Sequence, residues 1–234
     1  MPFSPYHHYS ASAKLVRLIE KLKNENHISE EDYFAFHRYH LSSNHKLKSA
    51  KYHLIKLMNK LTNVDIQEVV DPSGSFLFET NLYIDGYFYN CGSALDILAR
   101  EMLVLFGESL PDRIYFHTAH ELLSISRPGD SILSRTERPS WKKEFSAYRN
   151  ALTHELLLAA QVSVTFENRG PNQTHMVVLP LPDDPRIDIA ARTYNRNKNV
   201  LDYIEENFKR VLRLINGVYN EVYTRARDNN ALPL

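Results

Sequence analysis

Cysteine and glycine are both scarce in this chain of 234 residues. The single cysteine, Cys91, rules out an intramolecular disulfide and a multi-cysteine zinc site. The 7 glycines form neither a phosphate-binding loop nor a Gly-x-Ser-x-Gly elbow, which argues against P-loop, Rossmann and α/β-hydrolase functions. The sequence also lacks an apolar run of about eighteen residues and a signal-peptide pattern at its start. We therefore expect a cytoplasmic protein that does not bind a membrane.

Net charge is absent too. Lysine and arginine together number 28, and aspartate and glutamate also number 28. This balance argues against a protein that coats nucleic acid without regard to sequence, because such binding depends on excess positive charge. An enzyme that holds a few phosphates locally remains compatible with it. A hydrophobic content of 43% with 24% charged residues is typical of a globular chain.

Helical periodicity dominates what is present. Apolar residues recur every three or four positions in several long segments, which predicts amphipathic helices that bury one another. The fold class is therefore mainly α, with a core resembling a four-helix bundle. Helices are expected over 12–23, from 30 to about 39, 47–61, 76–106, 115–124, 140–156 and 199–227.

Two additions to the bundle are predicted. Residues 1–42 are expected to form an N-terminal helical extension, and residues 43–228 the bundle itself. Alternating apolar residues flank the turn sequence Asn168-Arg169-Gly170-Pro171-Asn172, so a β-hairpin is expected near 161–181, inserted between two helices.

One short stretch carries candidate chemistry, Arg149-Asn150-Ala151-Leu152-Thr153-His154. At about 100° per residue, a core stripe through Phe145 and Tyr148 places Asn150 and His154 together on the roughly opposite face. Arg149 flanks that face. The expectation is a polar cluster that points away from the chain's own core, towards solvent or a second copy of the protein.

This stretch resembles a known signature. Arg-Asn-x-x-x-His within a late bundle helix is similar to the motif of the HEPN superfamily (higher-eukaryote and prokaryote nucleotide-binding domains), and Ser93–Arg100 is similar to its second-helix sequence. The order of helices also fits, and the resemblance covers about residues 45–225. It implies a HEPN-like fold, a homodimer formed through the Arg149–His154 helix, and metal-independent cleavage of RNA. By family analogy the chain would act in a toxin–antitoxin or defence system, with an antitoxin or other protein as its partner.

The resemblance also implies roles for three side chains. His154 would be the general acid/base, since imidazole exchanges protons near neutral pH. Arg149 would bind the scissile phosphate, and Asn150 would orient the imidazole or contact the phosphate. Attack by the ribose 2′-hydroxyl would leave a 2′,3′-cyclic phosphate, with no metal and no cofactor.

Other readings of the same residues stay open. A HEPN-like module without catalysis could bind a nucleotide, RNA or protein, and a helical interaction protein could carry the cluster incidentally, with Arg149 paired to Glu144 or another acid. Arg38 with His45 and Arg113 with His120 match the spaced Arg…His pattern as well.

Two further candidate centres are weaker. His117 and His120, with the carboxyl group of Glu121 beside them, suggest a zinc site. A catalytic zinc ion needs three protein ligands, and the spacing identifies no matching third one. Cys91 lies on the apolar side of its helix, which indicates a buried structural thiol and not a nucleophile.

Overall fold

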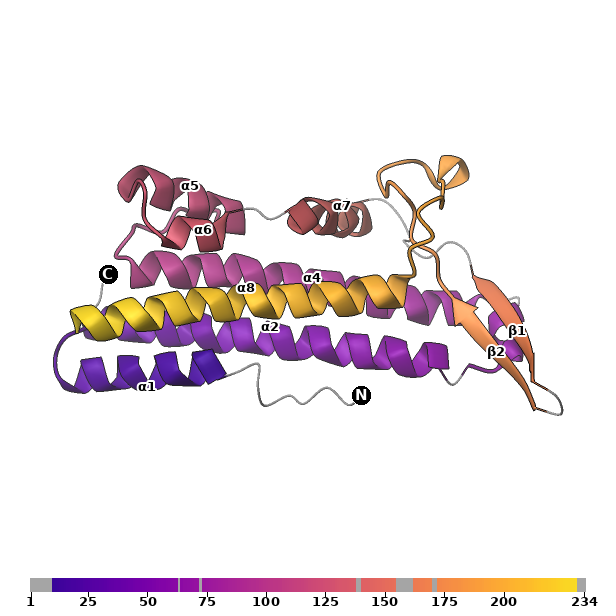
Figure 1. Ribbon diagram of the computed structural model, residues 1–234, viewed down its shortest axis with the longest axis horizontal. Helices are drawn as coiled ribbons and strands as arrows, with labels where there is room; N and C mark the ends of the chain where they lie inside the picture. Colours follow the sequence, from indigo (N-terminus) through magenta and orange to yellow (C-terminus); the bar gives the residue numbers. More distant parts are fainter. Residues whose placement is uncertain are drawn as a thin grey trace. The chain divides into compact units, whose positions relative to one another are not determined.

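The structure is a computed structural model that describes residues 10–62, 64–71, 73–137, 140–154, 162–169 and 172–230. For Ser10 and for residues 153–154, 165–169 and 172–176 it describes the backbone alone. Eight α-helices and one antiparallel strand pair lie within these ranges (Figure 1), which confirms the predicted mainly α fold with a hairpin. None of the described helices combines the length and the apolarity needed to cross a bilayer.

Two compact units make up the chain. The first unit comprises Met1–Lys46, Ser93–Arg138 and Lys209–Leu234, and the second comprises Leu47–Gly92 and Pro139–Phe208. Helices α2 (Glu30–Thr62), α4 (Ser75–Leu105) and α8 (Val200–Asn229) each contribute residues to both units. The division predicted at residue 42, between an N-terminal helical extension and the helical bundle, stays a prediction.

Helix α2 is longer than expected. The predicted helix from residue 30 was to end near Tyr39, yet α2 continues without interruption to Thr62, so that prediction is wrong. Its start is as expected, because the Asp32 backbone N–H donates to Ser29 Oγ at 3.0 Å and caps the helix. The polar residues after Tyr39 suggested a break. One of them, Ser43, is instead fully buried.

The apolar stripes of the other long helices are confirmed. Helix α4 buries most of its expected stripe, and α8 buries apolar residues along its length; the fully covered members of the two stripes include Tyr87, Cys91, Ala94, Leu98, Met102, Ile204, Val211, Val218 and Val222. Helix α4 ends at Leu105, and Gly107 follows with φ of 68°. The Gly107 and Glu108 N–H groups then donate to Val104 and Leu103 carbonyls, as in a Schellman stop.

The first unit also contains α1 (Ser10–Asn24), α5 (Phe116–Ser126) and α6 (Ile132–Thr136). Helices α1 and α5 lie close to their predicted ranges. Helix α6 lies between the helices expected over 115–124 and 140–156, and it was not predicted. The first nine residues of the predicted N-terminal helical extension lie outside the described residues.

The second unit contains α3 (Ile66–Val70), α7 (Ser140–His154), the 3-10 helix η1 (Ile189–Ala191) and the hairpin. Strands β1 (Ser163–Arg169) and β2 (Asn172–Val178) pair antiparallel, from Ser163 opposite Val178 to Arg169 opposite Asn172. The hairpin is confirmed. Residues 155–161, including the end predicted for the helix that begins at Ser140, lie outside the described residues.

A buried polar network holds the first unit together. His40 joins Ser12 of α1 to Glu101 of α4, with Nε2 at 2.8 Å from Ser12 Oγ and Nδ1 at 2.8 Å from Glu101 Oε1. The Tyr219 hydroxyl of α8 donates to Glu101 Oε2 at 2.9 Å. The Glu101 side chain is fully buried, and this burial raises the pKa of its carboxyl. The network thus connects four helices, with α2, α4 and α8 meeting at the Glu101 carboxyl group and α1 joined through His40.

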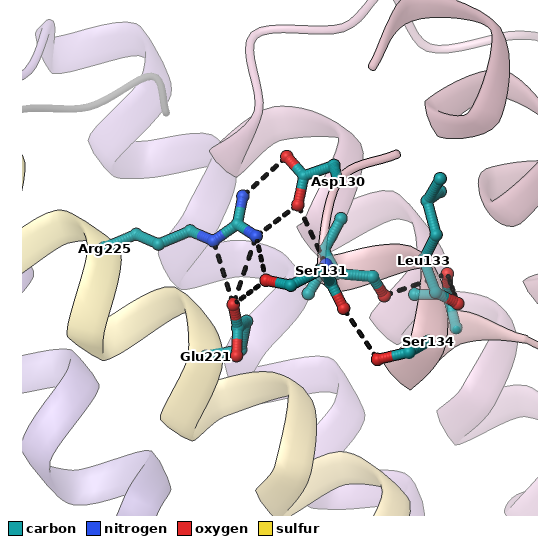
Figure 2. Close-up of polar contacts among 8 residues, drawn as sticks. Asp130, Ser131, Leu133, Ser134, Glu221 and Arg225 are labelled. Carbon is teal, nitrogen blue, oxygen red and sulfur yellow. Dashed lines mark hydrogen bonds and ion pairs between the residues drawn. The ribbon is translucent and has the colours of Figure 1, made fainter. Parts of the chain in front are cut away.

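A second polar cluster fixes α6 to α8 within the same unit (Figure 2). The Arg225 guanidinium donates to both carboxylate oxygens of Asp130, to Ser131 Oγ at 2.7 Å and to Glu221 Oε1 at 3.1 Å. Ser131 Oγ in turn donates to Glu221 at 2.6 Å. The hydrogen bonds from Arg225 lower the pKa of Asp130. A bidentate contact of this kind between Arg225 and Asp130 pairs the two charges and also fixes the position of α6.

Removing the Tyr219 hydroxyl tests the buried network. Tyr219→Phe leaves Glu101 Oε2 buried without its donor, so we expect the free energy of unfolding to fall by about 1–3 kcal/mol. Urea denaturation measures this loss. Tyr223→Phe, a half-buried tyrosine on the same helix, is the matched control and should change stability by less than about 0.5 kcal/mol. Equal effects of the two substitutions would contradict the role assigned to the network.

Candidate functional site

Helix α7 is anchored in the second unit by two aromatic residues. Phe145 and Tyr148 are buried, and the Phe145 ring lies 5.1 Å from the Phe88 ring of α4. The Tyr148 hydroxyl donates to the Pro182 carbonyl oxygen at 2.8 Å. These contacts fix the rotation of α7, and with it the positions of the three predicted site residues.

The predicted cluster is only partly on the outward face. Asn150 is exposed, as expected. Arg149 is half-buried and its side chain lies against Gly92 of α4, so the expectation that it points away from the core is wrong. The backbone of His154 forms the last described turn of α7. The side chain of His154, and therefore any contact between it and Arg149, lies outside the described part of the structure.

Gly92 makes this placement of Arg149 possible. A Cβ atom built on Gly92 would lie 2.4 Å from Arg149 Nε and 2.6 Å from Cζ, much closer than atoms can approach. Gly92 is itself buried. Because glycine has no side chain, the guanidinium end of Arg149 can lie directly on the α4 backbone. Any other residue at position 92 would move Arg149.

Glu144 pairs with residues other than Arg149. It was one of the acids considered as a partner of Arg149 if the cluster were incidental. In the structure its Oε1 accepts hydrogen bonds from Lys198 and, at 3.4 Å, from Arg196 Nη1. Glu144 therefore connects α7 to the segment before α8, and Arg149 is positioned by α4.

An open pocket lies beside Arg149. It has a volume of about 200 Å³ and is lined by Asp85, Phe88 and Tyr89 of α4 and by Arg149 and Leu152 of α7. An apolar cavity of about 150 Å³ already holds one benzene ring, so this pocket has room for one flat ring. It combines a cation, a carboxyl group, two aromatic rings and an aliphatic side chain.

Asp85 is the member of the pocket that sequence reasoning missed. Asp85 is an exposed residue, and among the described residues no hydrogen bond or ion pair engages its carboxyl group. Burial raises the pKa of Asp85. A carboxyl group that no side chain engages, beside a pocket with a cation and aromatic rings, is a candidate contact for a ligand. The available signal was its spacing, since positions 85, 89 and 92 share one face of a helix.

The alternative centres have structural explanations. His120 Nδ1 lies 2.9 Å from Thr136 Oγ1, and the His117 ring stacks on Tyr115 with 5.6 Å between centroids. Within the described ranges, no three histidine, cysteine, aspartate or glutamate side chains gather as metal ligands would. Arg38 and His45 are exposed on α2.

Cys91 is fully buried, which confirms the prediction of a buried structural thiol. Burial raises the pKa of the Cys91 thiol to about 12. At neutral pH the thiolate is therefore almost absent, and this cysteine cannot act as the nucleophile of the site.

Comparison with known proteins adds no family to this picture. No protein-family model, no curated protein and no solved structure matches the chain. The HEPN resemblance therefore stays a prediction from the Arg149–His154 motif and the order of the helices.

Substituting Gly92 tests the contact with Arg149. Replacing a helical glycine by alanine stabilises a helix by up to about 1 kcal/mol. In the wild-type background, Gly92→Ala should gain less than this or lose stability, because the new methyl group displaces Arg149. In an Arg149→Ala background the full gain should return. Thermal or urea denaturation of the four proteins measures a coupling of at least about 0.5 kcal/mol.

Gly217 of α8 is the matched control. The nearest atom to a Cβ built there is Arg135 Cδ at 3.9 Å, an ordinary contact. Gly217→Ala should change stability equally with and without the Arg149 side chain. If Gly92→Ala also has the same effect in both backgrounds, Arg149 does not lie on α4.

Proposed function

We propose that this protein is a metal-independent endoribonuclease whose site is built from Arg149, Asn150 and His154 of α7. The observation that carries the proposal is the position of Arg149, whose side chain is held on Gly92 at the wall of an open pocket with aromatic surface. A guanidinium group and aromatic rings together are what a phosphate and an unstacked base require of a protein. The resemblance of the motif to HEPN ribonucleases supports the same reading. We place the activity in the cytoplasm, with an antitoxin-like protein as its regulator.

The chemistry follows from the residue types. His154 accepts the proton of a ribose 2′-hydroxyl, and the 2′-oxygen attacks the neighbouring phosphorus. The bond from phosphorus to the 5′-oxygen breaks, and that oxygen receives a proton. The products are a 2′,3′-cyclic phosphate and a 5′-hydroxyl end. Arg149 binds the phosphate oxygens and stabilises the charge that builds on them. Asn150 lies on the helix face of position 154, where its amide can contact the phosphate.

Helix geometry favours a site shared by two copies. Positions 149 and 154 are separated by about 140° around the axis of α7, so they do not share a face. Positions 150 and 154 differ by about 40°, and Asn150 is exposed. We propose that two chains meet through α7, so that His154 of one copy acts on a phosphate held by Arg149 of the other.

A second candidate is a nucleotide- or RNA-binding module without catalysis. The observation in its favour is that the described residues of the pocket already bring a cation, a carboxyl group and aromatic rings together. Cleavage assays separate the two candidates.

The nuclease proposal predicts cleavage in EDTA. Purified protein should cut single-stranded RNA with a chelator present, and His154→Ala and Arg149→Ala should each reduce the rate by at least about 100-fold. The matched controls are Arg38→Ala and His45→Ala, which have the same residue types on the exposed face of α2 and should retain the wild-type rate. Cleavage that survives His154→Ala would rule out the mechanism, and binding without cleavage would favour the second candidate.

Mixing inactive variants tests the shared site. If the two catalytic residues come from different copies, co-refolded His154→Ala and Arg149→Ala chains regain one intact site per mixed dimer. Random pairing makes about half of the dimers mixed, so about a quarter of the wild-type rate should return. Sedimentation should also show a dimer of the 27.2 kDa chain. A mixture that stays inactive would place both residues of each site in one copy.

A further inference from the structure

The carboxyl group in the pocket restricts what can bind there. Asp85 and Arg149 line the same space, with opposite charges. A phosphate placed against Asp85 would meet a like charge, which is unfavourable. A group that donates hydrogen bonds would instead satisfy the Asp85 oxygens, which an ionised carboxylate uses only as acceptors. The phosphate therefore lies towards Arg149, and a neutral hydrogen-bond donor lies towards Asp85.

The rest of the pocket favours a flat aromatic donor. Tyr89 is 57% exposed, although it is a large aromatic residue, and Phe88 and Leu152 add apolar surface. Exposed aromatic rings beside a cation are the usual platform for an unstacked base. The volume of about 200 Å³ holds one base and leaves the attached sugar and phosphate outside.

The four RNA bases differ in what they offer a carboxylate. Guanine presents two adjacent donors on its Watson–Crick edge, the ring N1–H and the exocyclic amino group, which match the two oxygens of Asp85. Adenine and cytosine present one amino donor beside a ring nitrogen that accepts, and uracil presents one donor between two carbonyl acceptors. In each of those three bases an acceptor would face a carboxylate oxygen, which costs binding energy.

We propose that the pocket formed by Asp85, Phe88, Tyr89, Arg149 and Leu152 binds a guanine base of the RNA, and that Asp85 makes the choice of guanine. The base stacks on Tyr89, its Watson–Crick edge donates to Asp85, and Arg149 contacts the adjoining phosphate. This inference rests on the proposed function for its substrate class, and it makes Asp85 the specificity-determining residue of that site.

Nucleotide binding tests the inference without requiring cleavage. The full-length protein is titrated calorimetrically with the 5′-monophosphates of guanosine, adenosine, cytidine and uridine. We expect the guanosine nucleotide to bind at least about tenfold more tightly than the other three. Asp85→Asn preserves the shape of the side chain but replaces one acceptor with a donor. It should weaken binding of the guanosine nucleotide at least tenfold, so that the adenosine or cytidine nucleotide, whose donor and acceptor match the amide, binds more tightly.

Controls separate this inference from the nuclease proposal. Asp112→Asn removes an exposed carboxylate elsewhere and should keep the guanine preference. His154→Ala should keep it too, because the inference assigns the choice of base to Asp85 and not to His154. Guanine binding that depends on Asp85 in a protein without nuclease activity would support the pocket and overturn the proposed function. Cleavage that depends on His154, together with equal binding of all four nucleotides or a preference that Asp85→Asn leaves intact, would overturn the inference alone.

Discussion

The candidate site depends on the absence of a side chain at Gly92. The contact between Phe145 and Phe88 would let α7 pack on α4 whatever residue stood at position 92. The guanidinium group of Arg149, however, lies on the α4 backbone only because Gly92 has no Cβ atom. The same device occurs at Gly86, where a Cβ atom would lie 2.3 Å from the ring of His53 of α2. Two glycines six positions apart therefore allow two long polar side chains to lie against α4 from neighbouring helices.

Carboxyl groups in the two units have different surroundings. In the first unit Glu101 receives donors from His40 and Tyr219, so its oxygens are satisfied by the chain itself. In the second unit Asp85 lines an open pocket and has no such donor among the described residues. A satisfied buried network specifies how helices pack, whereas an unsatisfied group beside an opening is the usual mark of a binding site. Because of this contrast, we assign the binding site to the pocket between α4 and α7.

Much of the fold could be predicted, because α1, α4, α7 and α8 carry strong apolar periodicity and the hairpin has alternating strands around turn residues. The continuity of α2 could not be predicted, because the polar residues in its middle resemble a break between helices. The burial of His40 is explained only by its hydrogen-bond partners on other helices. The rotation of α7 was misjudged for a related reason. Its buried face includes Lys142 and Ala151 together with Phe145 and Tyr148, which turns Arg149 towards α4. The contribution of Asp85 depends on a pocket between two helices, which spacing alone does not reveal.

The most direct test of the account is photo-crosslinking of RNA to the protein, followed by mass spectrometric mapping of the modified residue. An RNA in which one guanosine is replaced by a photoreactive guanosine analogue should crosslink to Tyr89 or a pocket neighbour, and excess guanosine monophosphate should suppress the crosslink. Crosslinks that fall on α5, α6 or the Arg225 cluster, or that persist unchanged with excess nucleotide, would contradict the assignment of the α4–α7 pocket as the RNA site.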